Sequence, residues 1–342
     1  MSPRRIAAVF VARNREFLRD RSAVAWTIIL PVAIVFGFAF AFSGSAPERF
    51  LIGVIGIEDT QLEEGEAGLP MLRIDHVEYT AVESLADGRT KLRRHQLDLL
   101  LDPADRRYWI SDASPSGYLM EQVLRGVSAG GDSGYTREEV PGRTIRYVDW
   151  LVPGLLAMNM MFTALFGVGF VIVRYRKNGV LKCLKATPLT AAEFLIAQVG
   201  SRLIIITAIT SAIFVGSNFF LDFPVYGHWF NLLAVLVLGA ICLISLGLII
   251  AARTASEELA GGLLKMMSWP MMFLSGVWFS TEGLHPWLQA LATLLPLTHV
   301  IDAARGVMIE GQGLVAIAPH LGVLAAMSAV FLAIGAALFR WE

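Results

Sequence analysis

Residues 230–252 read FNLLAVLVLGAICLISLGLIIAA, a stretch without a single charged side chain. About 20 apolar residues in a helix cross the hydrocarbon core of a bilayer, which is roughly 30 Å thick, so this stretch predicts a transmembrane helix. Five further runs have a similar length and character: residues 22–42, 148–173, 197–221, 259–279 and 314–339. The sequence therefore predicts an α-helical integral membrane protein with six transmembrane helices.

The composition favours the same fold class. Of the 342 residues, 55% are hydrophobic and 17% are charged, and the mean hydropathy is +0.60. One soluble core would not hide so much apolar surface. The formal net charge of -1 argues against a nucleic-acid partner, because binding to a phosphate backbone needs a basic face.

Catalytic and metal-binding motifs are missing from the sequence. It contains no CxxC, HExxH, DxDxDG or GxSxG pattern, so we expect neither catalytic residues nor a metal site. The two cysteines, Cys183 and Cys242, fall in a basic loop and in an apolar run, where they are poorly placed to form a disulfide.

Positive residues in the short connecting segments predict the orientation. Lys and Arg are concentrated in residues 1–21 and in the loop after the second apolar run, whereas Arg305 is the one positive residue in the short loops of the opposite side. By the positive-inside rule, both termini are expected to be cytoplasmic in a multi-pass protein of the cell (inner) membrane.

The N-terminal segment has a structure of its own. Apolar residues recur at near-helical spacing among the arginines of residues 1–21, which predicts an amphipathic cytoplasmic elbow helix in the headgroup plane. For residues 22–42, a cleaved signal peptide is the alternative to a transmembrane helix, because Ala39-Phe40-Ala41 imitates a cleavage site. The apolar part of a signal peptide is only about 7 to 15 residues long, which favours the transmembrane helix.

Residues 45–146 form an insert of domain size with mixed α and β signals. Short strands are predicted at residues 51–57, 76–82, 98–102 and 108–111, and helices at residues 83–96 and 118–127. We expect a small acidic α/β extracytoplasmic domain between transmembrane helices 1 and 2. Residues 126–134 (GVSAGGDSG) predict a flexible linker; the alternative, a phosphate-binding loop, lacks the flanking strand and helix.

The loop at residues 174–193 reads RYRKNGVLKCLKATPLTAAE. Val180, Leu181 and Leu184 would share one side of a short helix among lysines, and Pro188 would end it. Such a helix is suited to docking onto a cytoplasmic partner. A positive-inside loop with a few buried leucines explains the same pattern equally well.

The order of these features resembles the type 2 permeases of ABC exporters. The similar stretches are residues 10–32 (FVARNREFLRDRSAVAWTIILPV), residues 176–190 (RKNGVLKCLKATPLT) and residues 269–306 (WPMMFLSGVWFSTEGLHPWLQALATLLPLTHVIDAARG). The last stretch has Ser-Gly after a proline, and Pro-Leu-Thr before an Asp and an Arg. The resemblance covers nearly the whole chain and is weakest in residues 45–146.

The resemblance implies that residues 176–190 hold a coupling helix that docks onto a separate cytoplasmic ABC ATPase. The docking residues would be Arg176, Gly179, Val180, Leu181, Leu184, Pro188 and Leu189. The resemblance also implies a dimer with a second copy or a paralogue, surrounded by membrane lipids. Because the chain has no GxxxxGK[ST] motif, we expect no cofactor on this chain, with ATP and Mg²⁺ bound by the partner ATPase.

The segment at residues 281–313 is too long for a tight turn. It contains two short apolar helices, at residues 284–294 and 297–309, separated by Pro296, and we expect a re-entrant hairpin between transmembrane helices 5 and 6. Asp302 and Arg305 are three residues apart and could form an ion pair; a gating contact is the alternative. Lys265, inside the fifth apolar run, either snorkels to the interface or contributes to gating.

Methionines gather in the second and fifth apolar runs, which border the translocation path in the similar family. The candidate path residues are Met158, Asn159, Thr163, Met266, Met267, Ser268, Met271 and Ser275. Flexible thioethers adapt to varied apolar shapes, which indicates a hydrophobic or amphipathic cargo; ordinary packing is the alternative explanation.

The sequence thus predicts an exporter permease for a lipid, drug or antibiotic, without enzymatic activity of its own. One alternative is a membrane receptor with a ligand-binding extracytoplasmic domain. Another is an ion-coupled carrier, which the scarcity of acidic residues at mid-membrane and the lack of an obvious inverted repeat disfavour.

Overall fold

A computed structural model describes most of the chain. The described residues are 1–41, 50–57, 77–82, 84–93, 96–111, 114–127, 135–140, 147–254, 256–281, 284–339 and 341. The chain divides into two compact units: a helical unit of Met1–Ser43 and Tyr147–Glu342, and an inserted unit of Gly44–Arg146.

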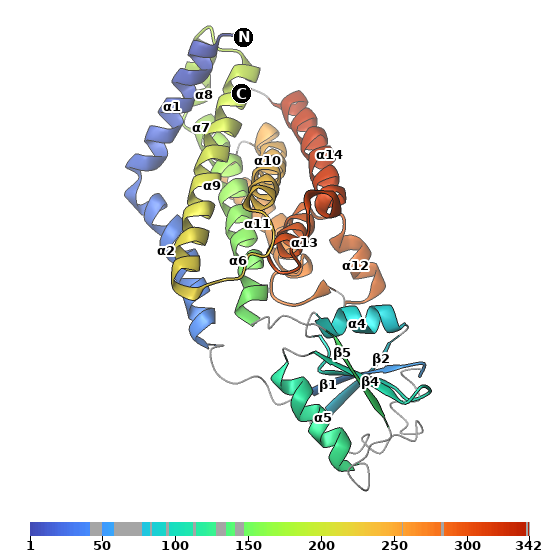
Figure 1. Ribbon diagram of the computed structural model, residues 1–342. Helices are drawn as coiled ribbons and strands as arrows, with labels where there is room; N and C mark the ends of the chain where they lie inside the picture. Colours follow the sequence, from blue (N-terminus) through green and yellow to red (C-terminus); the bar gives the residue numbers. More distant parts are fainter. Residues whose placement is uncertain are drawn as a thin grey trace. The chain divides into compact units, whose positions relative to one another are not determined.

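The described residues of the helical unit form helices and connecting segments, without a strand (Figure 1). The helices are α1 (Pro3–Arg19), α2 (Arg21–Ala41), α6 (Tyr147–Ala164), a π-helix η2 (Leu165–Phe170), α7 (Val171–Lys177), α8 (Val180–Lys185), α9 (Ala191–Leu221), α10 (Trp229–Arg253), α11 (Glu257–Leu274), α12 (Pro286–Ala292), α13 (Pro296–Met308) and α14 (Leu314–Leu338). The apolar α10 is central, since it packs against α9, η2, α13 and α14. Its residues 242–248 are all buried.

Among the described residues, five helices are long and apolar enough to cross a membrane. They are Arg21–Phe40, Val148–Lys177, Ala191–Leu221, Trp229–Arg253 and Leu314–Leu338. The prediction of a helical membrane protein is thereby confirmed. The predicted fifth span corresponds to α11, whose 18 residues include Glu257, Glu258 and Lys265. α11 carries three charges in its 18 residues, whereas each of the five apolar helices has an 18-residue stretch with at most two, so a total of six spans stays a prediction.

Two predicted loop segments are helical. The helix that begins with α6 continues through η2 and α7 to Lys177, four residues past the predicted end at residue 173. The next helix begins at Ala191 and not at residue 197, because Thr190 and Glu193 form a capping box. The Glu193 amide donates to Thr190 Oγ1 at 3.3 Å, and the Thr190 amide donates to Glu193 Oε2 at 3.0 Å. This reciprocal pairing satisfies two amides at the helix start.

The inserted unit contains a five-stranded sheet with the order β2-β1-β3-β4-β5. The strands are β1 (Phe50–Ile55), β2 (Val77–Val82), β3 (Leu99–Asp102), β4 (Arg107–Ser111) and β5 (Thr136–Val140). The β3–β4 pair is antiparallel and the other pairs are parallel. The sequence predicts four of these strands, but β5 (TREEV) was missed because it is a polar edge strand without an apolar pattern.

One helix covers each face of the sheet. Met120 and Leu124 of α5 (Pro115–Val127) pack with Ile52, Val54 and other residues on one face. Leu92 of α4 (Leu85–Arg93) packs with Leu100 and Trp109 on the other. Of the predicted linker at residues 126–134, Gly126 and Val127 end α5, and the rest lies outside the described residues.

Candidate functional site

The short helix α8 lies in the segment for which a docking role is predicted. A tight turn at Asn178 and Gly179 separates it from α7, and Gly179 supplies the left-handed backbone that this turn requires (φ +73°). Leu181 is fully buried, whereas Val180 is 37% exposed. Lys182, Cys183 and Lys185 are also exposed, and Leu184 is half-buried. The surface of α8 that a partner could reach is therefore formed by Val180 and the lysines, with Leu181 as the inward anchor.

Two further contacts fix the corner between α7 and α8. Arg176 donates from Nη1 to the carbonyl oxygen of Ala251 at 2.8 Å and from Nη2 to that of Ala252 at 3.0 Å. These carbonyls belong to the last turn of α10, where no intrahelical donor is available. Lys177 forms an ion pair with Glu257 at the start of α11, at 3.4 Å. Arg176 thus acts on α10 within the same chain, and the end of α7, which leads directly into α8, is held against α10 and α11.

The remaining docking candidates lie after α8. Pro188 is exposed and Leu189 is half-buried in the turn that leads to α9. The carbonyl oxygen of Pro188 accepts a hydrogen bond from Arg5 of α1. The loop is therefore connected to the N-terminal helix as well.

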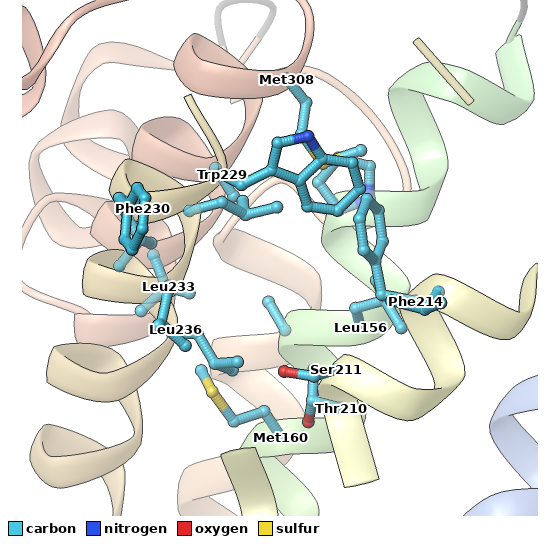
Figure 2. A pocket seen from close by; sticks show the side chains of 17 residues that line it. Leu156, Met160, Thr210, Ser211, Phe214, Trp229, Phe230, Leu233, Leu236 and Met308 are labelled. Carbon is cyan, nitrogen blue, oxygen red and sulfur yellow. The ribbon is translucent and has the colours of Figure 1, made fainter. Parts of the chain in front are cut away.

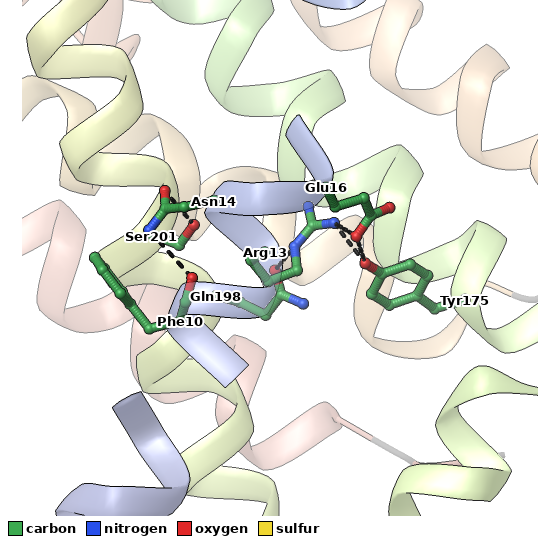
Figure 3. A network of polar contacts seen from close by, with 7 residues as sticks. All are labelled: Phe10, Arg13, Asn14, Glu16, Tyr175, Gln198 and Ser201. Atoms are coloured by element: carbon green, nitrogen blue, oxygen red, sulfur yellow. Dashed lines mark hydrogen bonds and ion pairs between the residues drawn. The ribbon is translucent and has the colours of Figure 1, made fainter. Parts of the chain in front are cut away.

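A polar network holds α1 against α9 (Figure 3). Arg13 donates to Gln198 Oε1 at 2.8 Å and pairs with Glu16 at 2.6 Å, while Ser201 donates to Asn14 at 3.1 Å. At the other end of α1, the Ser2 amide donates to Glu193 at 2.6 Å. α1 is a helix, as the sequence predicts for this segment, and these contacts place it alongside the first third of α9. Its position in the headgroup plane stays a prediction.

The predicted path residues do not form one site. Met158, Ser268, Met271 and Ser275 are buried, whereas Met266 is 74% exposed and Met267 is 36% exposed. Asn159 and Thr163 line a groove beside α1 and α2. The predicted path residues of α11 therefore lie on both its buried and its exposed side, and their role in a translocation path stays a prediction.

An apolar pocket of about 280 Å³ lies where α6, α9, α10 and α13 meet (Figure 2). Its lining includes Leu156, Met160, Phe214, Trp229, Leu233, Leu236 and Met308. The hydroxyls of Thr210 and Ser211 and the indole N–H of Trp229 are the polar side-chain groups among the described lining residues. Such a lining suits an acyl chain or an aromatic ring. No predicted path residue lines this pocket, because its walls come from four separate helices and no local pattern marks it.

Arg305 of α13 contacts the start of α6 and the turn after α11. It donates from Nε to the carbonyl oxygen of Trp150 at 3.1 Å and from Nη2 to that of Gly276 at 2.8 Å. Its guanidinium lies 3.6 Å from the centre of the Trp150 ring. Arg305 therefore fixes α13 to α6 and to the turn after α11. Its ion pair with Asp302 stays a prediction, as does a gating role for Lys265, which is exposed on α11.

The segment between α11 and α14 contains the two short helices that the sequence predicts. α12 begins at Pro286 and α13 begins at Pro296, each with proline at the start, where its missing amide costs nothing. α13 is buried along most of its length, whereas α12 has one buried residue, Ala292. Whether the pair enters the bilayer as a re-entrant hairpin stays a prediction.

Comparisons with known proteins identify one family model and several similar permease sequences. Residues 123–309 match the family model described as "ABC-2 type transporter". Nodulation protein J of Rhizobium leguminosarum bv. viciae is 27% identical over 234 residues, which are 67% of this chain and 87% of that protein. The probable multidrug ABC transporter permease YbhR of Escherichia coli (strain K12) is 24% identical over 196 residues, which are 57% of this chain and 53% of that protein. The matched residues include α8, the apolar pocket and Arg305.

Proposed function

Since this chain belongs to the ABC-2 type transporter family, we propose that it is the permease subunit of an ATP-driven exporter whose ATPase is a separate polypeptide. Permeases of this family are membrane components of ABC transporters and are not catalytic themselves. The chain is accordingly a multi-pass inner-membrane transport protein. ATP and Mg²⁺ would be bound by the partner, and two permeases, identical or related, would form the dimer.

One observation carries the proposed docking role: α8 lies at the end of the continuous helix Val148–Lys177 and is anchored from inside. Leu181 and Arg176 hold α8 and its turn in place, which leaves Val180 and two lysines for contact with the ATPase. A rigid support of this kind is needed if ATP-driven closure of the partner is to move the membrane helices.

The arrangement in the membrane follows from the same proposal. Both termini and α8 lie on the cytoplasmic side, and the inserted unit Gly44–Arg146 lies outside. α11 is the fifth of six spans, with Glu257 and Glu258 at the cytoplasmic boundary and Lys265 snorkelling toward it. α12 and α13 form the re-entrant hairpin on the outer side.

The proposed cargo is hydrophobic or amphipathic, such as a lipid, drug or antibiotic. The apolar pocket supports this class, because its lining offers two hydroxyls and one indole N–H within an otherwise apolar surface. The name of one relative, a probable multidrug permease, agrees with it. The candidate path residues are those that the sequence predicts in α6 and α11, with Lys265 and the pair Asp302 and Arg305 as candidate gating residues.

The docking role is tested by co-expression with a candidate ABC ATPase subunit and co-purification from membranes. Val180→Asp places a charge on the exposed side of α8 without changing the buried Leu181, so we expect the ATPase to be lost from washed membranes. Tyr226→Asp is the matched control, because Tyr226 is 45% exposed in the segment after the opposite end of α9. Full retention of the ATPase by Val180→Asp membranes would contradict the proposal. Vesicle uptake of lipids and drugs with both subunits then identifies the cargo.

A further inference from the structure

A groove of about 560 Å³ lies between the corner of α1 and α2 on one side and α6, η2, α7 and α9 on the other. Its charged residues are Arg13, Glu16, Asp20, Arg174 and Arg202. Its apolar wall is formed by Phe17, Trp26, Phe162, Phe166 and Phe170, with the small residues Ala23 and Gly167. Cations beside an aromatic wall are the chemistry that recognises an anionic amphiphile.

Arg202 is the central cation of this groove. It donates from Nε and Nη2 to the carbonyl oxygen of Thr163, at 3.1 and 3.0 Å, and its guanidinium lies 5.2 Å from the centre of the Phe17 ring. No carboxylate of the described residues forms an ion pair with Arg202. A guanidinium that is enclosed by helices and has no carboxylate partner favours the binding of an anionic ligand, because an unpaired charge away from water is costly.

A glycine of the π-helix, Gly167, leaves the space that this arginine occupies. A Cβ on Gly167 would lie 1.6 Å from Arg202 Nη2, so the guanidinium occupies the space that any other residue would fill. Gly167 lies in η2, two residues from its start. The position of Arg202 is therefore built into the fold and does not depend on a flexible side chain at the surface.

The two carboxylates of the groove are already engaged. Glu16 accepts from Arg13 at 2.6 Å and from the Tyr175 hydroxyl (Figure 3), and Asp20 accepts from the amide of Ala23 at 3.0 Å, which caps α2. Arg174, like Arg202, has no ion pair with the described residues. Three arginines face two carboxylates here, and the excess positive charge lies on the side of Arg174 and Arg202.

The length of α9 gives the level of Arg202 in the bilayer. α9 has 31 residues, about 46 Å at 1.5 Å per residue, whereas the hydrocarbon core is about 30 Å thick. Asp222 directly follows the helix and marks one boundary. About 20 residues measured back from Leu221 reach Arg202, which lies at the edge of the hydrocarbon core on the side of α8, within reach of the lipid phosphates.

We propose that this groove binds the phosphate head of an acidic phospholipid, with Arg202 as the principal cation and Arg174 as the second. The acyl chains would leave the groove along Trp26, which is 66% exposed, and along Phe162 and Phe166, whose ring centres are 6.1 Å apart. This aromatic wall is the reason to assign a lipid and not a free anion. The bound lipid would connect the corner of α1 and α2 to the helix that carries α8.

The test uses the full chain in nanodiscs of phosphatidylcholine containing phosphatidylglycerol, followed by native mass spectrometry to count the phosphatidylglycerol retained. Arg202→Gln removes the charge and is expected to weaken retention about tenfold or more, as for a lost charge-assisted contact. Arg174→Gln changes an exposed side chain without risk to folding, and a smaller loss of about threefold is expected. Arg15→Gln is the control: it removes an equal charge from exposed surface of α1 outside the groove.

Three outcomes would overturn the proposal. The first is that Arg202→Gln retains as much phosphatidylglycerol as the original chain. If Arg202→Gln does not fold, the corresponding result is that Arg174→Gln retains as much as the original chain. The second is an equal loss in Arg15→Gln, which would assign the lipid to general surface charge. The third is displacement of phosphatidylglycerol by inorganic phosphate, which would assign the groove to a free anion. None of these measurements needs an ATPase, so their result is independent of the proposed exporter function.

Discussion

Besides Arg5 of α1, three arginines in the described part of the helical unit donate to backbone carbonyl oxygens. Arg176 contacts the last turn of α10, Arg202 contacts Thr163 before the π-helix, and Arg305 contacts Trp150 and Gly276. Inside a bilayer, water does not satisfy such carbonyls, so a guanidinium with several donors replaces it. These arginines therefore position helices first, and any contact with cargo, lipid or partner is made from a fixed place.

Gly167→Ala tests how strictly Arg202 is placed. The new Cβ would collide with the guanidinium, so Arg202 must move and Thr163 loses its donor. We expect a loss of about 1–3 kcal/mol in the free energy of unfolding, measured by thermal unfolding in detergent. Gly216→Ala in α9 is the control, since no atom lies within 4 Å of its Cβ position. Equal stability of the two variants would show that Arg202 is not confined.

Among the helices, the start of α9 decides where the docking segment ends. Thr190 and Glu193 close the capping box, and Glu193 also accepts from the amide of Ser2. The T-x-x-E pattern at residues 190–193 is visible in the sequence, but the apolar run that predicts the span begins six residues later. The capping box thus makes the connection between α8 and α9 short.

Thr190→Ala removes the cap and is expected to destabilise the first turn of α9 by about 0.5–2 kcal/mol. Hydrogen exchange of amides in residues 191–194 should accelerate, and α1 should loosen with them because Ser2 is attached to Glu193. Thr187→Ala serves as the control, since the Thr187 hydroxyl donates to Leu184 and caps no helix start. Unchanged exchange in Thr190→Ala would contradict the importance of the cap.

The predictable part of the structure is the part that local pattern encodes. The five apolar helices, α8 and four strands follow from runs and periodicity in the sequence. The apolar pocket and the arginine groove need several helices at once, and no spacing within one segment reports distances between segments. For the same reason, Leu181 and Val180 look alike in the sequence, although one is buried and the other is exposed.

On the scale of the whole molecule, the inserted unit has a core of its own. The two clusters on the faces of its sheet consist of residues between Phe50 and Tyr135, including Leu99, Leu100 and Trp109. The helical unit is organised around α10 instead. Each unit therefore has the packing that independent folding requires.

We expect a fragment of residues 44–146 to fold alone as a soluble domain with one cooperative unfolding transition, measured by circular dichroism. Leu100→Asp should abolish that transition, because Leu100 is fully buried and an unpaired charge there is costly. Ala104→Asp, in the exposed turn between β3 and β4, should leave it unchanged. A fragment without any cooperative transition would mean that the unit depends on the rest of the chain.

The unbroken course from α6 through the π-helix to α7 has a mechanical consequence. Its 30 residues from Val148 to Lys177 form an arm about 45 Å long, with α8 close to one end. A swing of about 5° about one tip carries the other through about 4 Å on such an arm. If a partner displaces α8, we therefore expect a small rotation of this arm to shift side chains at its other end by several ångströms, because no loop interrupts the arm between them.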